Sequence, residues 1–134
     1  KEKLFAEAVE KAFGPAVIVA EESDTIARDA AEALVARTDP GADPLEPFLI
    51  MLRSVSHPVA VQIVRDAIER HVGQRLARQL PEPGAAVRGD VILSVISGVL
   101  LMRRVIATRA LSEAGNNQLV DILEGVFASV ITAD

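Results

Sequence analysis

The fold is decided by the stretch Val91-Ile-Leu-Ser-Val-Ile-Ser-Gly-Val-Leu-Leu-Met102, which lies inside a helix predicted over about residues 85–108. The stretch contains no charged residue, and its apolar side chains do not keep to one side. At about 100° per residue, Ile92 and Ile96 point away from Val91 and Met102. A helix that is apolar nearly all round must be buried nearly all round.

A second apolar helix is predicted over residues 119–131, and both helices carry a strip of small residues that would let another backbone come close. One domain of this size covers one face of each helix easily, but both faces with difficulty. The economical arrangement is a four-helix contact with a second copy about a two-fold axis. The residues expected at this interface are Ser94, Ser97, Gly98, Leu101, Ile122, Gly125, Val126 and Ser129. The alternative is a central helix wrapped by the other helices of a single chain.

Composition places the chain among single-domain proteins with an aliphatic core. It has 134 residues, half of them apolar, with four Phe, no Trp or Tyr and no Cys. The absence of Cys removes disulfides, thiolate zinc sites and cysteine nucleophiles together. The net charge of −5 repels phosphate backbones, so these residues do not resemble a nucleic-acid surface. The longest apolar stretch, 12 residues, is too short to span a bilayer, and a cytoplasmic location is the expectation.

Helical periodicity and turn residues divide the chain into six predicted helices with no strand. We therefore expect an all-α fold and one domain over residues 1–134. Residues 109–117 are expected to form a loop before the last helix. The six predicted helices cover about residues 2–13, 24–37, 45–55, 58–80, 85–108 and 119–131.

Catalytic and metal-binding patterns are scarce. Neither His57 nor His71 has a second histidine or an acid at the spacing of a helical metal motif. Ser94 and Ser97 have no histidine or acid near them in the sequence, and we interpret them as packing residues whose hydroxyls bond back to the preceding turn. Arg103 is expected to complement a helix C-terminus or to pair with an acid such as Asp90 or Glu124. The sequence thus predicts neither an enzyme nor a metal or other cofactor.

A binding cavity is the remaining possibility. The helices at 45–55 and 58–80, with the first helix and one side of the central helix, could enclose an apolar space or pack as a solid core. Methionine would suit a cavity that changes shape with its occupant. The candidate lining residues are Phe13, Phe48, Met51, Leu52, Val64, Ile68, His71, Val95 and Met102.

Three segments resemble the tetracycline-repressor-like (TetR) family of transcriptional regulators. Lys1-Glu-Lys-Leu-Phe-Ala-Glu-Ala-Val9 is similar to the segment that follows the helix-turn-helix in that family. Arg88, Gly98-Val99 and Arg103 resemble the Arg…Gly-(Leu/Val)-x-x-x-Arg pattern of its penultimate helix, and Ser56-His57-Pro58 resembles the Ser-Asp-Pro opening of the helix before it. Actinobacterial members, rich in Ala, Val and Arg, look most similar.

The resemblance implies an all-α ligand-binding and dimerisation domain, whose last two long helices build a dimeric four-helix bundle. It implies a homodimer, a small apolar effector and a repressor that this effector releases from DNA. Operator DNA would be bound only through the helix-turn-helix, which this chain lacks. Two other hypotheses stand beside it. One is a stand-alone helical module that binds a protein partner, and the other is an enzyme in a helical bundle, which would need clustered His or carboxylates in its interior.

Overall fold

The computed structural model describes residues 26–39 and 52–132, together with Lys3, Glu7 and Leu49; the predicted helix at 2–13 and most of that at 45–55 lie outside these residues. Throughout the described part the regular structure is helical and no strand occurs, which confirms the all-α prediction. The elements are α2 (Ile26–Thr38), α4 (Pro58–Ala67), η2 (Ile68–Gly73), α5 (Gln74–Ala77), α6 (Ala85–Leu100), η3 (Leu101–Val105), α7 (Arg109–Glu113) and α8 (Asn116–Ile131).

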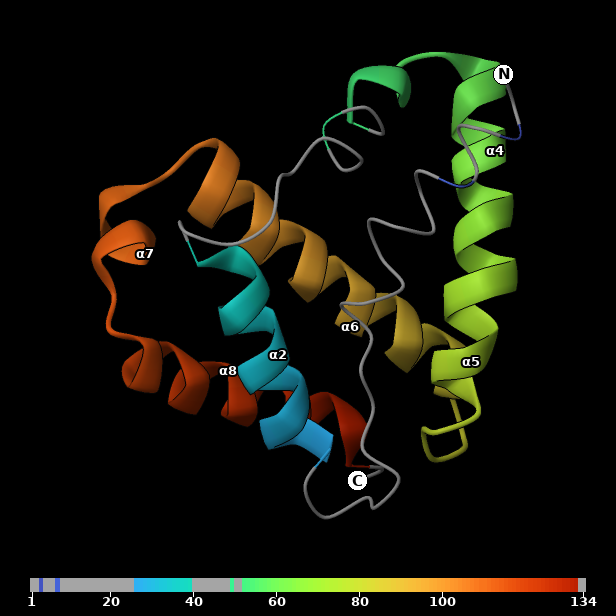
Figure 1. Ribbon diagram of the computed structural model, residues 1–134. Coiled ribbons are helices and arrows are strands. Elements are labelled where there is room, and N and C mark those ends of the chain that lie inside the picture. The colour runs from blue at the N-terminus through green and yellow to red at the C-terminus, as the bar shows by residue number, and fades with distance from the viewer. Residues whose placement is uncertain (1–2, 4–6, 8–25, 40–48, 50–51, 133–134) are drawn as a thin grey trace.

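The helices pack around α6, which crosses the molecule between two groups (Figure 1). On one side α2 lies along α8, and this pair makes the most extensive contact between elements. On the other side α4, η2 and α5 form one continuous rod, whose α5 end packs against α6. The core between these elements is aliphatic apart from Phe127, which is fully buried. The prediction of a Val/Ile/Leu/Ala core is therefore confirmed for the described residues.

The rod from α4 to α5 contains a π-helical segment, η2, that keeps its two ends in register with the core. Val64 and Ala67 are buried before this segment, and Leu76 and Leu80 are buried after it. In an uninterrupted α-helix these two pairs would face different directions, since the spacing from 67 to 76 is not a whole number of turns. A π-turn holds about one residue more than an α-turn. The wider turn therefore rotates Leu76 and Leu80 back toward the core.

The predicted loop at 109–117 and the predicted start of the last helix at residue 119 were wrong. Residues 109–117 are not a loop throughout, because α7 occupies Arg109–Glu113 and α8 begins at Asn116 instead of residue 119. The short α7 is held by tertiary contact, since its Leu111 packs against the core cluster. A single helical turn gives too little periodicity to be recognised in a sequence.

The continuous helix Ala85–Val105 is 21 residues long, and an 18-residue window within it has a mean hydropathy of 1.8, so by length and composition it could cross a membrane. The uncharged stretch of 12 residues is only part of this helix, so the prediction that it is too short to span a bilayer does not hold for the helix as a whole. However, this helix carries Arg103, which is 3% exposed and hydrogen-bonded to α2. A buried arginine that donates hydrogen bonds to a neighbouring helix of the same domain is typical of the core helix of a helical domain.

The helical segment 85–105 is followed, two residues later, by Ala107, which adopts a left-handed conformation with φ of 58°. A side chain makes this conformation unfavourable, and glycine is the residue that usually occupies it at a helix end. We therefore expect Ala107→Gly to raise the free energy of unfolding by about 0.5–1 kcal/mol. Ala110→Gly, at an exposed helical position three residues on, should instead lower it by a similar amount. Urea denaturation of both variants would measure this, and equal effects of the two substitutions would contradict it.

Candidate functional site

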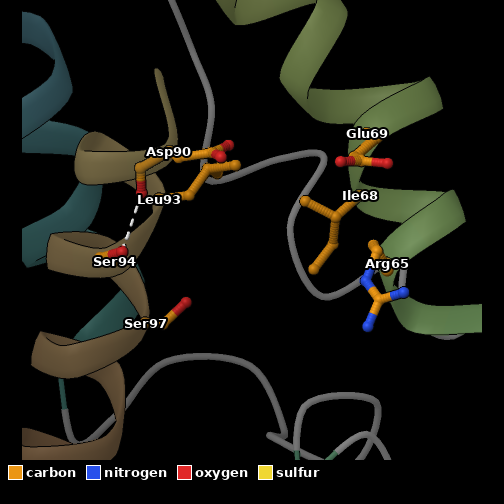
Figure 2. A pocket seen from close by; sticks show the side chains of 7 residues that line it. All are labelled: Arg65, Ile68, Glu69, Asp90, Leu93, Ser94 and Ser97. Atoms are coloured by element: carbon orange, nitrogen blue, oxygen red, sulfur yellow. Dashed lines mark hydrogen bonds between the residues drawn. The ribbon is translucent and has the colours of Figure 1, made fainter. Parts of the chain in front are cut away.

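A cavity of about 370 Å³ lies between the rod of α4 and η2 and the middle of α6 (Figure 2). Two of its seven lining residues are apolar, Ile68 from η2 and Leu93 from α6. The other five are polar or charged. Among the residues that the structure describes, the lining consists of Arg65, Ile68, Glu69, Asp90, Leu93, Ser94 and Ser97.

The charged side chains of the lining come from both walls of the cavity. Glu69 on η2 and Asp90 on α6 point toward one another across it, and Arg65 lies one helical turn before Glu69 (Figure 2). In the part of the chain that the structure describes, no hydrogen bond or ion pair involves any of these three side chains. Ser94 Oγ donates to the Asp90 backbone oxygen at 2.8 Å, and so bonds back to the preceding turn as expected. The cavity thus offers two carboxylates and one guanidinium to an occupant.

Five of the nine predicted pocket residues have side chains that the structure describes, and these five do not lie together. Phe13, Phe48 and Met51 lie outside the described residues, and of His71 only the backbone is described. Of the remaining five, Ile68 alone lines the cavity. Val64 is buried in the core, Leu52 and Val95 pack against the core cluster, and Met102 is exposed on η3. The apolar pocket predicted from these residues remains a prediction.

The residues predicted for a dimer interface fall on two faces of α6 and one face of α8. Ser94 and Ser97 line the cavity, while Leu101 packs against the core cluster. A separate exposed face of α6 and η3 carries Val87, Val91, Gly98, Met102 and Val105. An exposed face of α8 carries Ile122, Gly125, Val126 and Ser129. Ile122 is 56% exposed and Val87 is 68% exposed, so both helices keep apolar strips that the single chain leaves in contact with solvent.

The glycines on these strips have free space above them. A Cβ atom built on Gly98 or on Gly125 would meet nothing within 4 Å. Glycine in a helix interior costs about 0.5–1 kcal/mol relative to alanine. Packing within the single chain therefore does not require glycine at either position.

Two arginines of α6 and η3 hold the C-terminal ends of other helices. The Arg103 guanidinium donates to Val35 O at 3.0 Å and to Thr38 Oγ1 at 2.9 Å, both in the last turn of α2. It also donates to Leu111 O in α7 and to Asn116 Oδ1 in α8. This confirms the predicted role at a helix C-terminus, where the helix dipole favours a cation. Glu124, one of the two acids predicted as possible partners of Arg103, pairs with Arg28 instead.

Arg88 acts in the same way at the other end of the helix. Its guanidinium donates to the backbone oxygens of Val130 and Thr132, at the end of α8. Arg88 and Arg103 are the two arginines of the pattern Arg…Gly-(Leu/Val)-x-x-x-Arg. Both have a positioning role in this structure, since they tie α6 to α8 and η3 to α2.

An exposed ion-pair group joins α2 to α8 on the surface. The Arg28 guanidinium donates to Glu124 at 2.8 Å, to Asp121 at 3.3 Å and to Glu32 at 3.1 Å. The hydrogen bonds to Glu124 and Asp121 raise the pKa of Arg28 above its usual value. Among the described residues, no group of three or more His, Asp or Glu side chains is arranged to hold a metal ion.

Sequence reasoning missed four cavity residues: Arg65, Glu69, Asp90 and Leu93. Arg65 and Glu69 are both exposed, as charged residues on a helix surface usually are. The helices predicted at 58–80 and 85–108 were both expected to border a space. Charged residues on the sides of these helices that face one another were therefore the sequence signal that could have identified the missed cavity residues.

These observations define an all-helical domain with an open, charged cavity beside its central helix and with two exposed apolar strips. Residues 24–131 match the family described as "Tetracyclin repressor-like, C-terminal domain". No curated protein and no solved structure matches the chain. Because the match spans most of the sequence, the chain belongs to this tetracycline-repressor-like family, as its C-terminal domain.

Proposed function

We propose that this chain is the effector-binding and homodimerisation domain of a DNA-binding transcriptional regulator, a repressor that a small ligand releases from its operator. The observation that carries the proposal is the double role of α6. One face of this helix lines the 370 Å³ cavity, through Asp90, Leu93, Ser94 and Ser97. The neighbouring face presents the exposed apolar strip that starts at Val87.

The exposed strips on α6 and α8 support self-association. Exposed apolar surface of this kind marks interaction sites in globular proteins. A second copy would cover it with an identical surface, because a two-fold interface uses the same patch on both subunits. The candidate interface then consists of Gly98 and Met102 on one helix and Ile122, Gly125 and Val126 on the other.

Contact with DNA belongs to a separate segment in this proposal. The net charge of −5 makes this domain a poor binding surface for phosphate groups. A ligand in the cavity would act by favouring one position of α6 over another, and so one arrangement of the dimer. The proposal includes a cytoplasmic location and no enzymatic activity.

Native mass spectrometry of the purified chain tests the proposal most directly. We expect the mass of two chains, and any small adduct would give the mass of the bound effector. A single-chain mass at micromolar concentration would contradict the dimer. It would favour instead a helical module whose apolar strips bind a different protein.

A further inference from the structure

We propose that the cavity between η2 and α6 selects a cationic ligand, a compact apolar body that carries an ammonium group. The inference rests on the proposed function, since it concerns the effector of the same domain. It also differs from the small apolar effector that the family resemblance implies, because the described lining of this cavity is mostly polar or charged.

The described lining of the cavity carries a net negative charge. It includes two carboxylates and one guanidinium beside four uncharged residues, which gives these seven residues a formal charge of −1. Glu69 and Asp90 come from opposite walls and point toward one another (Figure 2). Like charges that face one another across a cavity repel, and a cation between them replaces this repulsion with two attractions.

Within the described part of the chain, neither cavity carboxylate has a hydrogen-bond or ion-pair partner. Arg65 and Glu69 stand four residues apart, a spacing at which an arginine and a glutamate on a helix commonly pair. No ion pair between them exists in the described structure, and Glu69 points into the cavity instead. Elsewhere in the described residues, Glu32, Asp121 and Glu124 all pair with Arg28. The cavity carboxylates therefore keep their capacity to accept hydrogen bonds from a ligand.

The volume of the cavity and its apolar surface limit the size and the shape of the ligand. Ile68 and Leu93 contribute the apolar surface, one from each wall. Ser94 and Ser97 extend the α6 wall with hydroxyl groups, which can accept a further hydrogen bond from an ammonium group. A cavity of about 370 Å³ lies in the range that holds small organic ligands. A compact hydrocarbon cage with one charged group matches this lining.

Three ligands of nearly equal shape test the charge preference: 1-adamantylamine, 1-adamantanol and 1-adamantanecarboxylate. Their binding to the full chain would be measured by isothermal titration calorimetry. We expect the amine, which is an ammonium ion at neutral pH, to bind about tenfold more tightly than the alcohol, and the carboxylate to bind most weakly. Added salt should reduce the difference between amine and alcohol, because it screens partly exposed charges.

Two isosteric variants assign the preference to the proposed residues. Glu69→Gln and Asp90→Asn should each weaken binding of the amine about threefold and leave binding of the alcohol unchanged. Glu113→Gln is the matched control, because it removes one exposed negative charge from α7, outside the cavity lining. It should leave all three affinities unchanged. A preference for the amine that survives in both cavity variants would overturn the assignment.

The cavity-filling variant Ser97→Phe separates failure of this inference from failure of the proposed function. If the alcohol binds as tightly as the amine, and Ser97→Phe abolishes both, the cavity binds ligands but has no preference for a cation. That result would overturn the inference and leave the proposed function in place. If none of the three ligands binds the wild-type chain, both the inference and the effector-binding role of this cavity are overturned. Circular dichroism would show that each variant keeps its helical fold.

Discussion

Replacing Arg103 with methionine is expected to lower the free energy of unfolding by about 3 kcal/mol, the largest effect of any single substitution considered for this domain. The Arg103 side chain is buried and makes four hydrogen bonds, two of them to the last turn of α2. Methionine fills a similar volume but donates nothing, so the Val35 and Leu111 carbonyls each lose a charged donor. A buried acceptor left without its donor costs about 1–3 kcal/mol.

Arg103→Lys should recover only part of this loss. A lysine ammonium has three donors on one nitrogen and cannot reproduce the planar fork of the guanidinium. It cannot reach acceptors in α2, α7 and α8 at the same time. Arg78→Met is the matched control, because Arg78 is exposed at the end of α5 and its loss should change stability by less than about 0.5 kcal/mol.

Urea denaturation of the three variants would measure these differences. All samples must be compared at one protein concentration, since the proposed dimerisation would add a concentration-dependent contribution to stability. An Arg103→Met variant as stable as Arg78→Met would show that the contacts of Arg103 with α2 do not hold the domain together.

The second large effect is expected at the glycines of the exposed strips. Gly98→Leu and Gly125→Leu should each weaken dimerisation about 100-fold or more. In the single chain neither position has an atom within 4 Å of the added Cβ, so we expect the monomer to keep its fold. Leucine also favours a helix over glycine, so the monomer should gain up to about 1 kcal/mol. In a two-fold interface, however, each substitution appears twice and obstructs a close approach of the helices.

Gly115→Leu provides the control for these variants. Gly115 also has open space above its Cα atom, but it lies at the N-cap of α8, before the exposed strip. Its substitution should leave the dimer intact. Sedimentation equilibrium would measure the dissociation constants of all three variants. Wild-type dimerisation of both Gly98→Leu and Gly125→Leu would exclude these strips as the interface.

A combination of stabilised monomer and weakened dimer would be informative in itself. Gly89 is buried, and an added Cβ there would lie 3.7 Å from Leu76 and Leu80, an ordinary van der Waals contact within the chain. At Gly98 and Gly125 an added Cβ would meet nothing within 4 Å, so packing within one chain gives no reason for glycine at these two positions. Association with another copy would supply one.

The sequence alone determined the helical class of this protein and the centre of its fold. Helical periodicity and turn residues are local properties, so they located α2, α6 and the rod from α4 to α5 in the described part of the chain. The apolar character of the central helix all round its axis identified it as the element that the others pack against. The charge of Arg103 at the end of that helix correctly indicated a role at a helix C-terminus.

Only the tertiary structure decided which residues meet. Val35 and Arg103 are 68 residues apart in the chain, and the acceptors of Arg103 were therefore invisible to any local pattern. The same holds for Glu69 and Asp90, which are ordinary exposed acids on their own helices and form a site only because η2 and α6 face one another. Periodicity fixes the direction of a side chain around its own helix. The neighbour that lies in that direction is set by the packing of distant segments, and this is why Ser94 and Ser97 border a cavity on a helix where sequence alone had predicted an interface.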